Sequence, residues 1–357
     1  MSYAERAGAL RSLEAARQSR ILAYFLSDRE TFPPGAPGFA TMLSTEPQLI
    51  IVELLKEIGY VDRLDLFLYT RGGATECVWP LVVVLREHCK TLSVIVPFRA
   101  HSAGTMICLG ADEVIMTDFA ELSPIDPTTG NQFNPRDPTN PLNQFGISVE
   151  DVVAYFKLSE DLAQIRDEAN RLEVFKQLTT NVHPLALGNV QRVYLLIRRL
   201  AQRLLSLHMD ENEQSKLIND IIEGLTTQFY SHVHAVLRKE AQALLGDWVK
   251  APTEAERPII EGLLDMYVAD LRLTERYSVP AEMGQNPLAD VTATGAYLET
   301  TTQSYAHETV MTISQRANVP PGFPIAGSGS LGPGVPRAYD FAIQRMGWKK
   351  SDTAEEA

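Results

Sequence analysis

Two short apolar runs and the segment between them are the most clearly patterned part of the chain. Leu64–Tyr69 and Leu92–Pro97 are rich in aliphatic and aromatic residues and are bounded by turn-forming residues, which predicts two buried strands. Between them, Glu76–His88 repeats apolar residues at helical spacing. A strand, a helix and a strand over this length predict a βαβ unit with parallel neighbouring strands. Their carboxyl ends then meet at one edge of the sheet, where α/β proteins place their ligand sites.

Each predicted strand ends in a polar turn built from small residues. Arg71–Ala74, which includes two consecutive glycines, follows the first strand, and His101–Thr105 follows the second. In the second turn, Ser102 precedes the apolar segment Ala103–Gly110, which reads as a buried helix. A serine in this position is most often an N-cap, because its hydroxyl accepts a free backbone N–H. The same pattern is also typical of a serine nucleophile beside a glycine turn whose N–H groups bind an oxyanion.

Four blocks of sequence carry a resemblance to a known family. They are Tyr69–Gly73, Ser102–Thr105, Ala111–Met116 and Leu122–Pro127. In order and spacing they resemble the Clp-fold serine peptidases, and within these the serine dehydrogenase proteinase family. Signal peptide peptidase A and the Clp proteolytic subunit are more distant relatives. A weaker match continues from Leu225 through Ser231–His234 to Glu240 and Ala241.

The resemblance implies both a fold and a chemistry. The implied fold is α/β, a Clp/crotonase-like arrangement of stacked βαβ units with additional C-terminal helices. The implied chemistry is the hydrolysis of peptide bonds through an acyl-enzyme on Ser102, with the N–H groups of Gly73 and Ala103 forming the oxyanion hole. Because both turns follow adjacent parallel strands, we expect the hydroxyl of Ser102 to lie close to the N–H of Gly73.

The general base is not indicated by a single motif. The Clp proteolytic subunit takes its histidine from the segment that matches Ile125–Pro127, and no histidine lies there in this chain. Signal peptide peptidase A uses a lysine, and the first lysine after Ser102 is Lys157, in the predicted helix Val149–Leu162. Such a lysine needs burial to lose its charge. His183 is a third candidate, but nothing in the sequence directs its ring toward the serine.

The favoured candidates for the base are His232 and His234. Their segment matches the region where the Clp proteolytic subunit carries its triad aspartate, and imidazole titrates in a useful range. His234 is placed slightly ahead because it adjoins the apolar start of the next predicted helix, and Asp126 is expected to orient a histidine. A histidine hydrogen-bonded at a helix start explains the same residues without catalysis. A His-x-His pair without a third ligand is a weak metal signal, so we expect no metal and no cofactor.

Composition narrows the class of protein. The chain has 357 residues, 45% of them hydrophobic, and a formal net charge of −13, which argues against a nucleic-acid partner. No apolar run has the length of a membrane span or the features of a signal peptide. The three cysteines, Cys77, Cys89 and Cys108, are expected to be buried free thiols in a reducing, cytoplasmic compartment.

The rest of the chain predicts mainly helices around the core. We expect a catalytic domain at 1–250, a helical extension at 251–319, and a Gly/Pro-rich linker with an acidic tail at 320–357. The expected helices outside the core unit are Ser2–Ser27 (with Arg20–Leu26 as an alternative strand), Gln48–Ile58, Val149–Leu162, Val190–His208, Glu213–Gly224 and Glu254–Thr274. The long, apolar, arginine-bearing helix Val190–His208, together with the family resemblance, favours a homo-oligomer.

Three functional hypotheses follow. The first is a serine peptidase that acts on a peptide or protein substrate through Ser102. The second is a catalytically silent Clp-fold protein that serves as an oligomeric interaction scaffold. The third, an acyl-CoA enzyme of the same superfold, is disfavoured because Ser102 matches the position of the peptidase nucleophile. The identity of the substrate, an unfoldase or adaptor partner and the number of subunits are not predicted.

Overall fold

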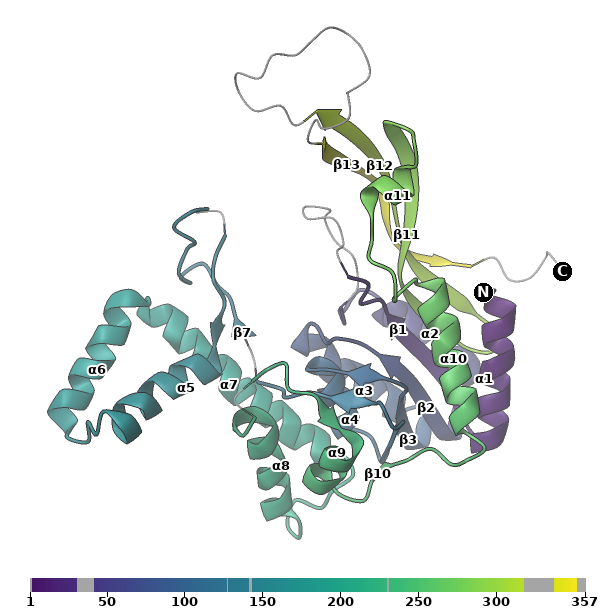
Figure 1. Ribbon diagram of the computed structural model, residues 1–357. Helices are drawn as coiled ribbons and strands as arrows, with labels where there is room; N and C mark the ends of the chain where they lie inside the picture. The colour runs from purple at the N-terminus through teal and green to yellow at the C-terminus, as the bar shows by residue number, and fades with distance from the viewer. Residues whose placement is uncertain are drawn as a thin grey trace, which may run out of the picture.

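A mixed sheet of eight strands forms the centre of the computed structural model, which describes residues 2–30, 42–126, 128–140, 143–229, 231–317 and 337–351. The strand order is β10-β5-β3-β2-β1-β11-β12-β13. The first five strands in this order are mutually parallel, and the last three pair antiparallel. The protein therefore has a mixed α/β fold with a large parallel and antiparallel sheet, as expected at the level of fold class (Figure 1).

The described strands have the following bounds: β1 (Arg20–Leu26), β2 (Val61–Tyr69), β3 (Cys89–Val96), β4 (Arg99–Ala100), β5 (Glu113–Met116), β6 (Glu121–Leu122), β7 (Thr128–Thr129), β8 (Ile147–Ser148), β9 (Val236–Leu237), β10 (Val249–Lys250), β11 (Leu288–Glu299), β12 (Ser304–Ala317) and β13 (Arg337–Lys350). The described α-helices are α1 (Tyr3–Arg17), α2 (Gln48–Ile58), α3 (Val78–Arg86), α4 (Ala103–Leu109), α5 (Val149–Lys157), α6 (Glu168–Asn181), α7 (Pro184–Leu205), α8 (Ser215–Thr227), α9 (Arg238–Leu245), α10 (Arg257–Asp270) and α11 (Val279–Met283).

Helices cover both faces of the parallel strands, which explains why those strands read as continuous apolar runs. The larger core lies on the face covered by α2, α3, α4, α7, α8 and α9. On the other face α1 and α10 pack together, with Leu10, Leu13, Ile260 and Tyr267 against alternate residues of β1 and β2. The predicted βαβ unit is present: β2 and β3 are parallel neighbours, and α3 connects them.

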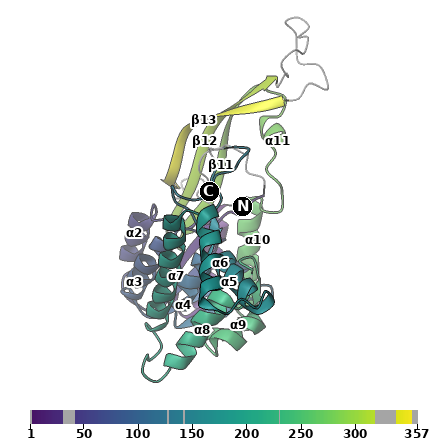
Figure 2. The same ribbon diagram turned by 90° about the vertical axis from the view of Figure 1, so that its left-hand side faces the viewer.

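Two groups of elements extend from this body. The strands β11, β12 and β13 form a long antiparallel ribbon that rises beyond the helices in both views (Figures 1 and 2). The helices α5 and α6 project from the first part of α7 (Figure 1). Within the described residues, no helix is both long and apolar enough to cross a membrane.

The prediction of a single helix over Ser2–Ser27 was wrong in its second half. Ser2–Ser27 is not one helix but α1 followed by β1, the alternative considered for Arg20–Leu26. Gln18 ends α1 in a left-handed conformation with φ 52°. The residues that follow are buried on both faces of the sheet, so the apolar run belongs to a strand and not to a helical stripe.

The C-terminal expectations also need correction. The stretch 251–319, expected to be helical, contains α10 and α11 but also β11 and β12. The stretch 320–357, expected to be linker and tail, contains the strand β13. The Gly/Pro-rich part and most of the acidic tail lie outside the described residues. Because β11 pairs with β1, the ribbon continues the core sheet. The boundaries of the three expected domains remain predictions.

Most other expected helices are confirmed with shifted ends. Gln48–Ile58 is α2 as expected, and Val149–Leu162 is α5 continued by a wider π-helical turn at Leu158–Leu162. Val190–His208 begins earlier, as α7, because His183 caps the helix and Pro184 occupies its first turn. The three cysteines are buried and form no disulfide, as expected.

Candidate active site

The glycine turn after β2 is held between two neighbouring segments. On one side, Thr70 donates its N–H to the carbonyl of Arg99 (3.0 Å), which continues β2 alongside β4. On the other side, Leu43 donates its N–H to the carbonyl of Gly72 (2.8 Å) and accepts the N–H of Ala74 (2.9 Å). Since successive N–H groups of an extended chain alternate in direction, the N–H of Gly73 faces away from Leu43.

Ser102 occupies a strained backbone conformation at the start of α4. Its φ is 49° and its ψ is −111°, a combination uncommon for a residue with a side chain. Its hydroxyl makes no capping hydrogen bond, so the N-cap interpretation does not explain this serine. Strained residues between a strand and a helix are frequent at functional sites, where the turn presents a nucleophile.

The two turns are in direct contact through Gly72. A Cβ atom on Gly72 would lie 2.9 Å from the Cβ of Ser102, 2.9 Å from the carbonyl oxygen of His101 and 3.3 Å from the N of Ala103. The φ of Gly72 is 101°, which also favours glycine. The first glycine of the pair therefore allows the close approach, a role that the sequence did not distinguish from that of Gly73.

Two backbone N–H groups beside Ser102 have no acceptor. Within the part of the chain that the structure describes, the N–H groups of Gly73 and Ala103 donate to no protein atom. The N–H of Ala103 belongs to the first residue of α4, where no intrahelical acceptor exists. These are the two groups that the resemblance names as the oxyanion hole.

Two polar side chains, Ser123 just after β6 and Thr105 in α4, hold the turn that carries Ser102. Ser102 donates its N–H to the hydroxyl of Ser123 (2.7 Å), and Ser123 donates its own N–H to the hydroxyl of Thr105 (3.0 Å). Thr105 in turn donates to the carbonyl of Ala100 (2.8 Å). Ser123 and Thr105 are buried. Both lie in blocks that carry the resemblance, but neither had been given a role.

One histidine and one carboxylate meet near this strand. The Nδ1 of His232 lies 2.9 Å from Oδ1 of Asp126, whose side chain is 4% exposed, whereas the imidazole is 42% exposed. The segments that carry them are joined by the pairing of β6 with β9 and by the N–H of Ile125, which donates to the carbonyl of Leu225 (2.9 Å). The hydrogen bond from Asp126 raises the pKa of His232 above its usual 6.5.

The other candidate bases have different partners. The Nε2 of His234 lies 3.1 Å from Glu240, and its ring stacks on Phe229. His183 caps α7 by accepting the N–H of Leu185 (3.2 Å), and its ring stacks on Phe133. Lys157 is exposed at the end of α5. The structure thus brings Asp126 together with His232 and not with His234.

His101, which the sequence analysis had given no role, precedes the serine. Its Nε2 lies 3.1 Å from the carboxylate of Glu121, and its side chain is 21% exposed. Burial lowers the pKa of His101 to about 4, helped by the positive charges of Arg99 and Arg71. The imidazole is therefore neutral near pH 7.

Comparison with known proteins confirms the resemblance over the N-terminal part. Residues 1–136 match the family of ClpP-like SDH-type serine proteinases. Two uncharacterized proteins of Methanocaldococcus jannaschii are similar: one is 32% identical over 124 residues, 34% of this chain and 41% of the relative. The other is 30% identical over 121 residues, 34% of this chain and 42% of the relative. The match thus covers about two fifths of the length of these relatives.

Two experimental structures were also found. Both are variants of the 1510-N membrane-bound stomatin-specific protease, one of them in complex with a substrate peptide. The first is 13% identical with a TM-score of 0.33, and the alignment covers 57% of this chain and 70% of that one. The second is 12% identical with a TM-score of 0.33, and covers 57% and 66%.

Proposed function

We propose that this protein is a serine peptidase of the Clp-like class, in which Ser102 is the nucleophile and His232 the general base. The observation that carries the proposal is the contact of the two turns. It supports the proposal because Gly72 packs against the strained serine, next in sequence to Gly73, and the N–H groups of Gly73 and Ala103 are free. The family match over residues 1–136 supports a serine proteinase of Clp-like, and by extension Clp/crotonase-like, architecture.

The reaction then proceeds in two steps. The hydroxyl of Ser102 attacks the carbonyl carbon of the peptide, its proton moves to the Nε2 of His232, and the oxyanion accepts hydrogen bonds from Gly73 and Ala103. The same imidazolium protonates the leaving amine, which breaks the C–N bond and leaves an ester on Ser102. A water molecule, deprotonated by His232, hydrolyses this ester and restores the hydroxyl. Asp126 keeps the imidazole oriented and stabilises its charged form.

His232 is preferred to the other candidates on the basis of its partner. A base that must receive a proton is helped by a buried carboxylate on its other nitrogen, and Asp126 supplies one at 2.9 Å. His234 is held by Glu240, and Lys157 lies on an exposed helix end. We therefore place His232 ahead of His234, in the reverse of the order favoured from sequence.

Labelling with a fluorophosphonate tests the proposal. The probe reacts with an activated serine, so the wild-type chain should be labelled and Ser102→Ala should not. Replacing His232 with alanine should slow labelling by roughly 10²–10⁴-fold, the usual contribution of a general base. His234→Ala and His183→Ala are matched controls and should keep near wild-type rates. Labelling that survives His232→Ala but is lost in Lys157→Ala would establish a serine–lysine mechanism instead.

The alternative function is that of a silent oligomeric scaffold, and absence of labelling at any pH would favour it. Self-association is proposed under either hypothesis, because α7 exposes Leu195 (55%) and Leu196 (51%) on its surface. A stable monomer in light scattering would contradict it. We also propose a reducing, cytoplasmic environment, supported by the three buried free thiols.

A further inference from the structure

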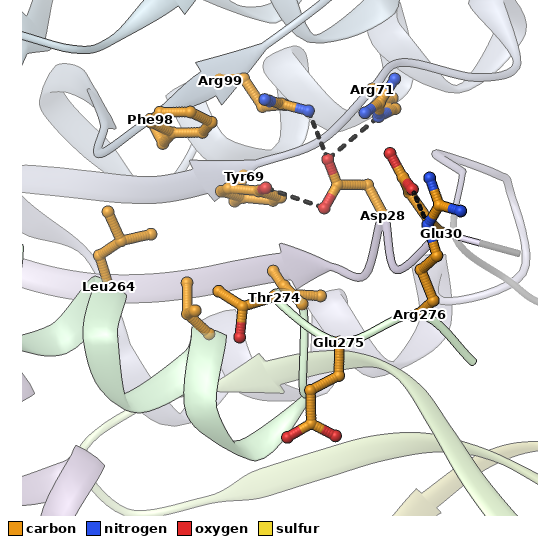
Figure 3. A pocket seen from close by; sticks show the side chains of 12 residues that line it. Asp28, Glu30, Tyr69, Arg71, Phe98, Arg99, Leu264, Thr274, Glu275 and Arg276 are labelled. Carbon is orange, nitrogen blue, oxygen red and sulfur yellow. Dashed lines mark hydrogen bonds and ion pairs between the residues drawn. The ribbon is translucent and has the colours of Figure 1, made fainter. Parts of the chain in front are cut away.

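A cavity of about 510 Å³ opens at the carboxyl ends of β1, β2 and β3, on the face of the sheet that α10 covers (Figure 3). Its volume lies within the range of ligand pockets in proteins, about 300–1,000 Å³. The site of the cavity is also the expected one, since α/β sheets bind ligands beyond the carboxyl ends of their parallel strands. None of the residues assigned above to the reaction lines it.

Part of the cavity wall is apolar. Tyr69 and Phe98 form one side, and Leu264 of α10 lies on the other (Figure 3). Val268 of α10 and Leu273, in the turn after it, also line the cavity. The two sets of residues are between 166 and 204 positions apart in the chain, so the cavity exists only because α10 packs across the strand ends. An apolar group that enters the cavity exchanges water for contact with both walls.

Five of the six charged groups that line the cavity are paired with each other. The carboxylate of Asp28 accepts hydrogen bonds from the hydroxyl of Tyr69 (2.9 Å), Nε of Arg71 (3.0 Å) and a terminal nitrogen of Arg99 (2.5 Å). At the rim, Glu30 pairs with Arg276 (3.1 Å). The charges of these groups balance one another, so the part of the cavity that a peptide side chain can bury is the apolar wall.

The cavity adjoins both turns of the candidate active site. Arg71 directly precedes Gly72 and lies two residues from Gly73, and Arg99 lies three residues before Ser102. At about 3.8 Å between consecutive Cα atoms, Arg99 is at most about 11 Å from the serine. Alternate side chains of an extended peptide point the same way about 7 Å apart. Arg99 and Ser102 are thus separated by no more than about three residues of an extended peptide.

From this arrangement we propose that the cavity is a substrate subsite. It accepts an aromatic or branched aliphatic side chain of a peptide residue that lies at most a few residues from the scissile bond. The inference rests on the proposed peptidase function and adds to it the class of sequence that is cleaved. Asp28 has a positioning role here, because it joins the cavity wall to the segments on either side of the nucleophile.

Peptide binding to the Ser102→Ala chain tests the subsite without relying on catalysis. Fluorescent hexapeptides would carry alanine, leucine, phenylalanine, lysine or glutamate at one position at a time, and fluorescence anisotropy would measure their affinities. We expect one position at which leucine or phenylalanine binds at least tenfold more tightly than alanine, lysine or glutamate. Val268→Trp, which fills the cavity, should abolish this preference. Ala269→Trp, on the exposed side of the same helix, should keep it.

A second variant allows the subsite to be tested even if Val268→Trp does not fold. Leu264→Ala enlarges the cavity and should move the preference from leucine toward tryptophan at the same position. Equal affinity for all side chains at every position, or an unchanged preference in both Val268→Trp and Leu264→Ala, would overturn the subsite. Fluorophosphonate labelling of the wild-type chain reports separately on the reaction. A selective but unlabelled protein would contradict the peptidase function, and a labelled but unselective one would contradict only the subsite.

Discussion

Replacing Gly72 with alanine is the most direct perturbation of the proposed site. The added Cβ would lie 2.9 Å from the Cβ of Ser102 and 2.9 Å from the carbonyl oxygen of His101. Both distances are shorter than any ordinary contact, and one of the atoms belongs to the backbone. The serine turn must therefore move away from the glycine turn, or the glycine turn must open.

Two costs to stability follow from the structure. Alanine at φ 101° occupies a sparsely populated conformation, at a cost of about 1–3 kcal/mol. Overpacking of a tight contact adds about 1–3 kcal/mol. The effect on the reaction should be larger, because a shift of about 1 Å between nucleophile and oxyanion donors costs roughly 10²-fold in rate. Loss of one donor costs about 10²–10³-fold.

The assay compares labelling rate with stability in three variants. Gly59→Ala tests the backbone strain alone, since φ of Gly59 is 74° and its Cβ would meet nothing within 4 Å. Gly110→Ala tests overpacking alone, since its Cβ would lie 2.6 Å from a methyl carbon of Val82 in the core. Urea unfolding gives the free energy lost in each variant, and fluorophosphonate labelling gives the rate at Ser102.

We expect Gly72→Ala to lose at least 100-fold in labelling rate, whereas Gly59→Ala and Gly110→Ala lose stability but label at close to the wild-type rate. Wild-type labelling of folded Gly72→Ala would refute the oxyanion geometry. Equal losses of rate in all three variants would show that labelling follows stability, and the contact of the two turns would then have no special role.

Three further predictions concern the groups around the nucleophile. Because Asp126 raises the pKa of His232, the acid limb of the rate–pH profile should lie above pH 6.5. Asp126→Asn should move this limb to lower pH and reduce the rate at the plateau. An acid limb that does not move would exclude His232 as the base. Ser123→Ala removes the acceptor of the N–H of Ser102 and should slow labelling several-fold, with a loss of about 1–3 kcal/mol in unfolding free energy. Burial lowers the pKa of His101 to about 4, so the unfolded chain binds a proton below pH 6.5 that the folded chain does not. The free energy of unfolding should fall by at most about 3 kcal/mol between pH 6.5 and 4, and His101→Gln should remove this part of the pH dependence in urea titrations.

The core βαβ unit was predictable because its residues satisfy local rules. Leu64–Tyr69 is part of a strand with helices on both faces, so its residues are apolar except Asp65, which is buried and paired with Arg17. A run of this length with turns at both ends has few other interpretations. The two polar turns were then placed by topology alone, since adjacent parallel strands end at the same edge.

The β-ribbon was not predictable by the same means. Strand β12 alternates buried with partly exposed residues and carries histidine, glutamate and arginine, so it lacks a continuous apolar run. Its stability comes from pairing along its whole length with β11 and β13, and β11 in turn pairs with β1, more than 260 residues earlier in the chain. Such long-range pairing is not visible in a local window, and the Gly/Pro-rich stretch before β13 further suggested a linker.

The choice between His232 and His234 required the structure for a different reason. The two residues are on one short segment with nearly the same neighbours, so no local pattern distinguishes them. The ring of Phe229 and the carboxylate of Glu240 hold His234, whereas the pairing of β6 with β9 brings His232 to Asp126. A contact between residues 106 positions apart decided the assignment.

The burial of Asp126 and the exposure of His232 indicate which member of the pair faces the substrate. In the Clp proteolytic subunit that this chain resembles, the histidine comes from the segment that carries Asp126 here, and the aspartate from the segment that carries His232. In the proposed site this exchange keeps the hydrogen bond but reverses which segment supplies the base. An imidazole that takes the proton of the serine must lie on the side of the substrate, with the carboxylate behind it. The carboxylate is 4% exposed and the imidazole 42%, so the imidazole is the member of the pair that solvent, and with it a peptide, can reach.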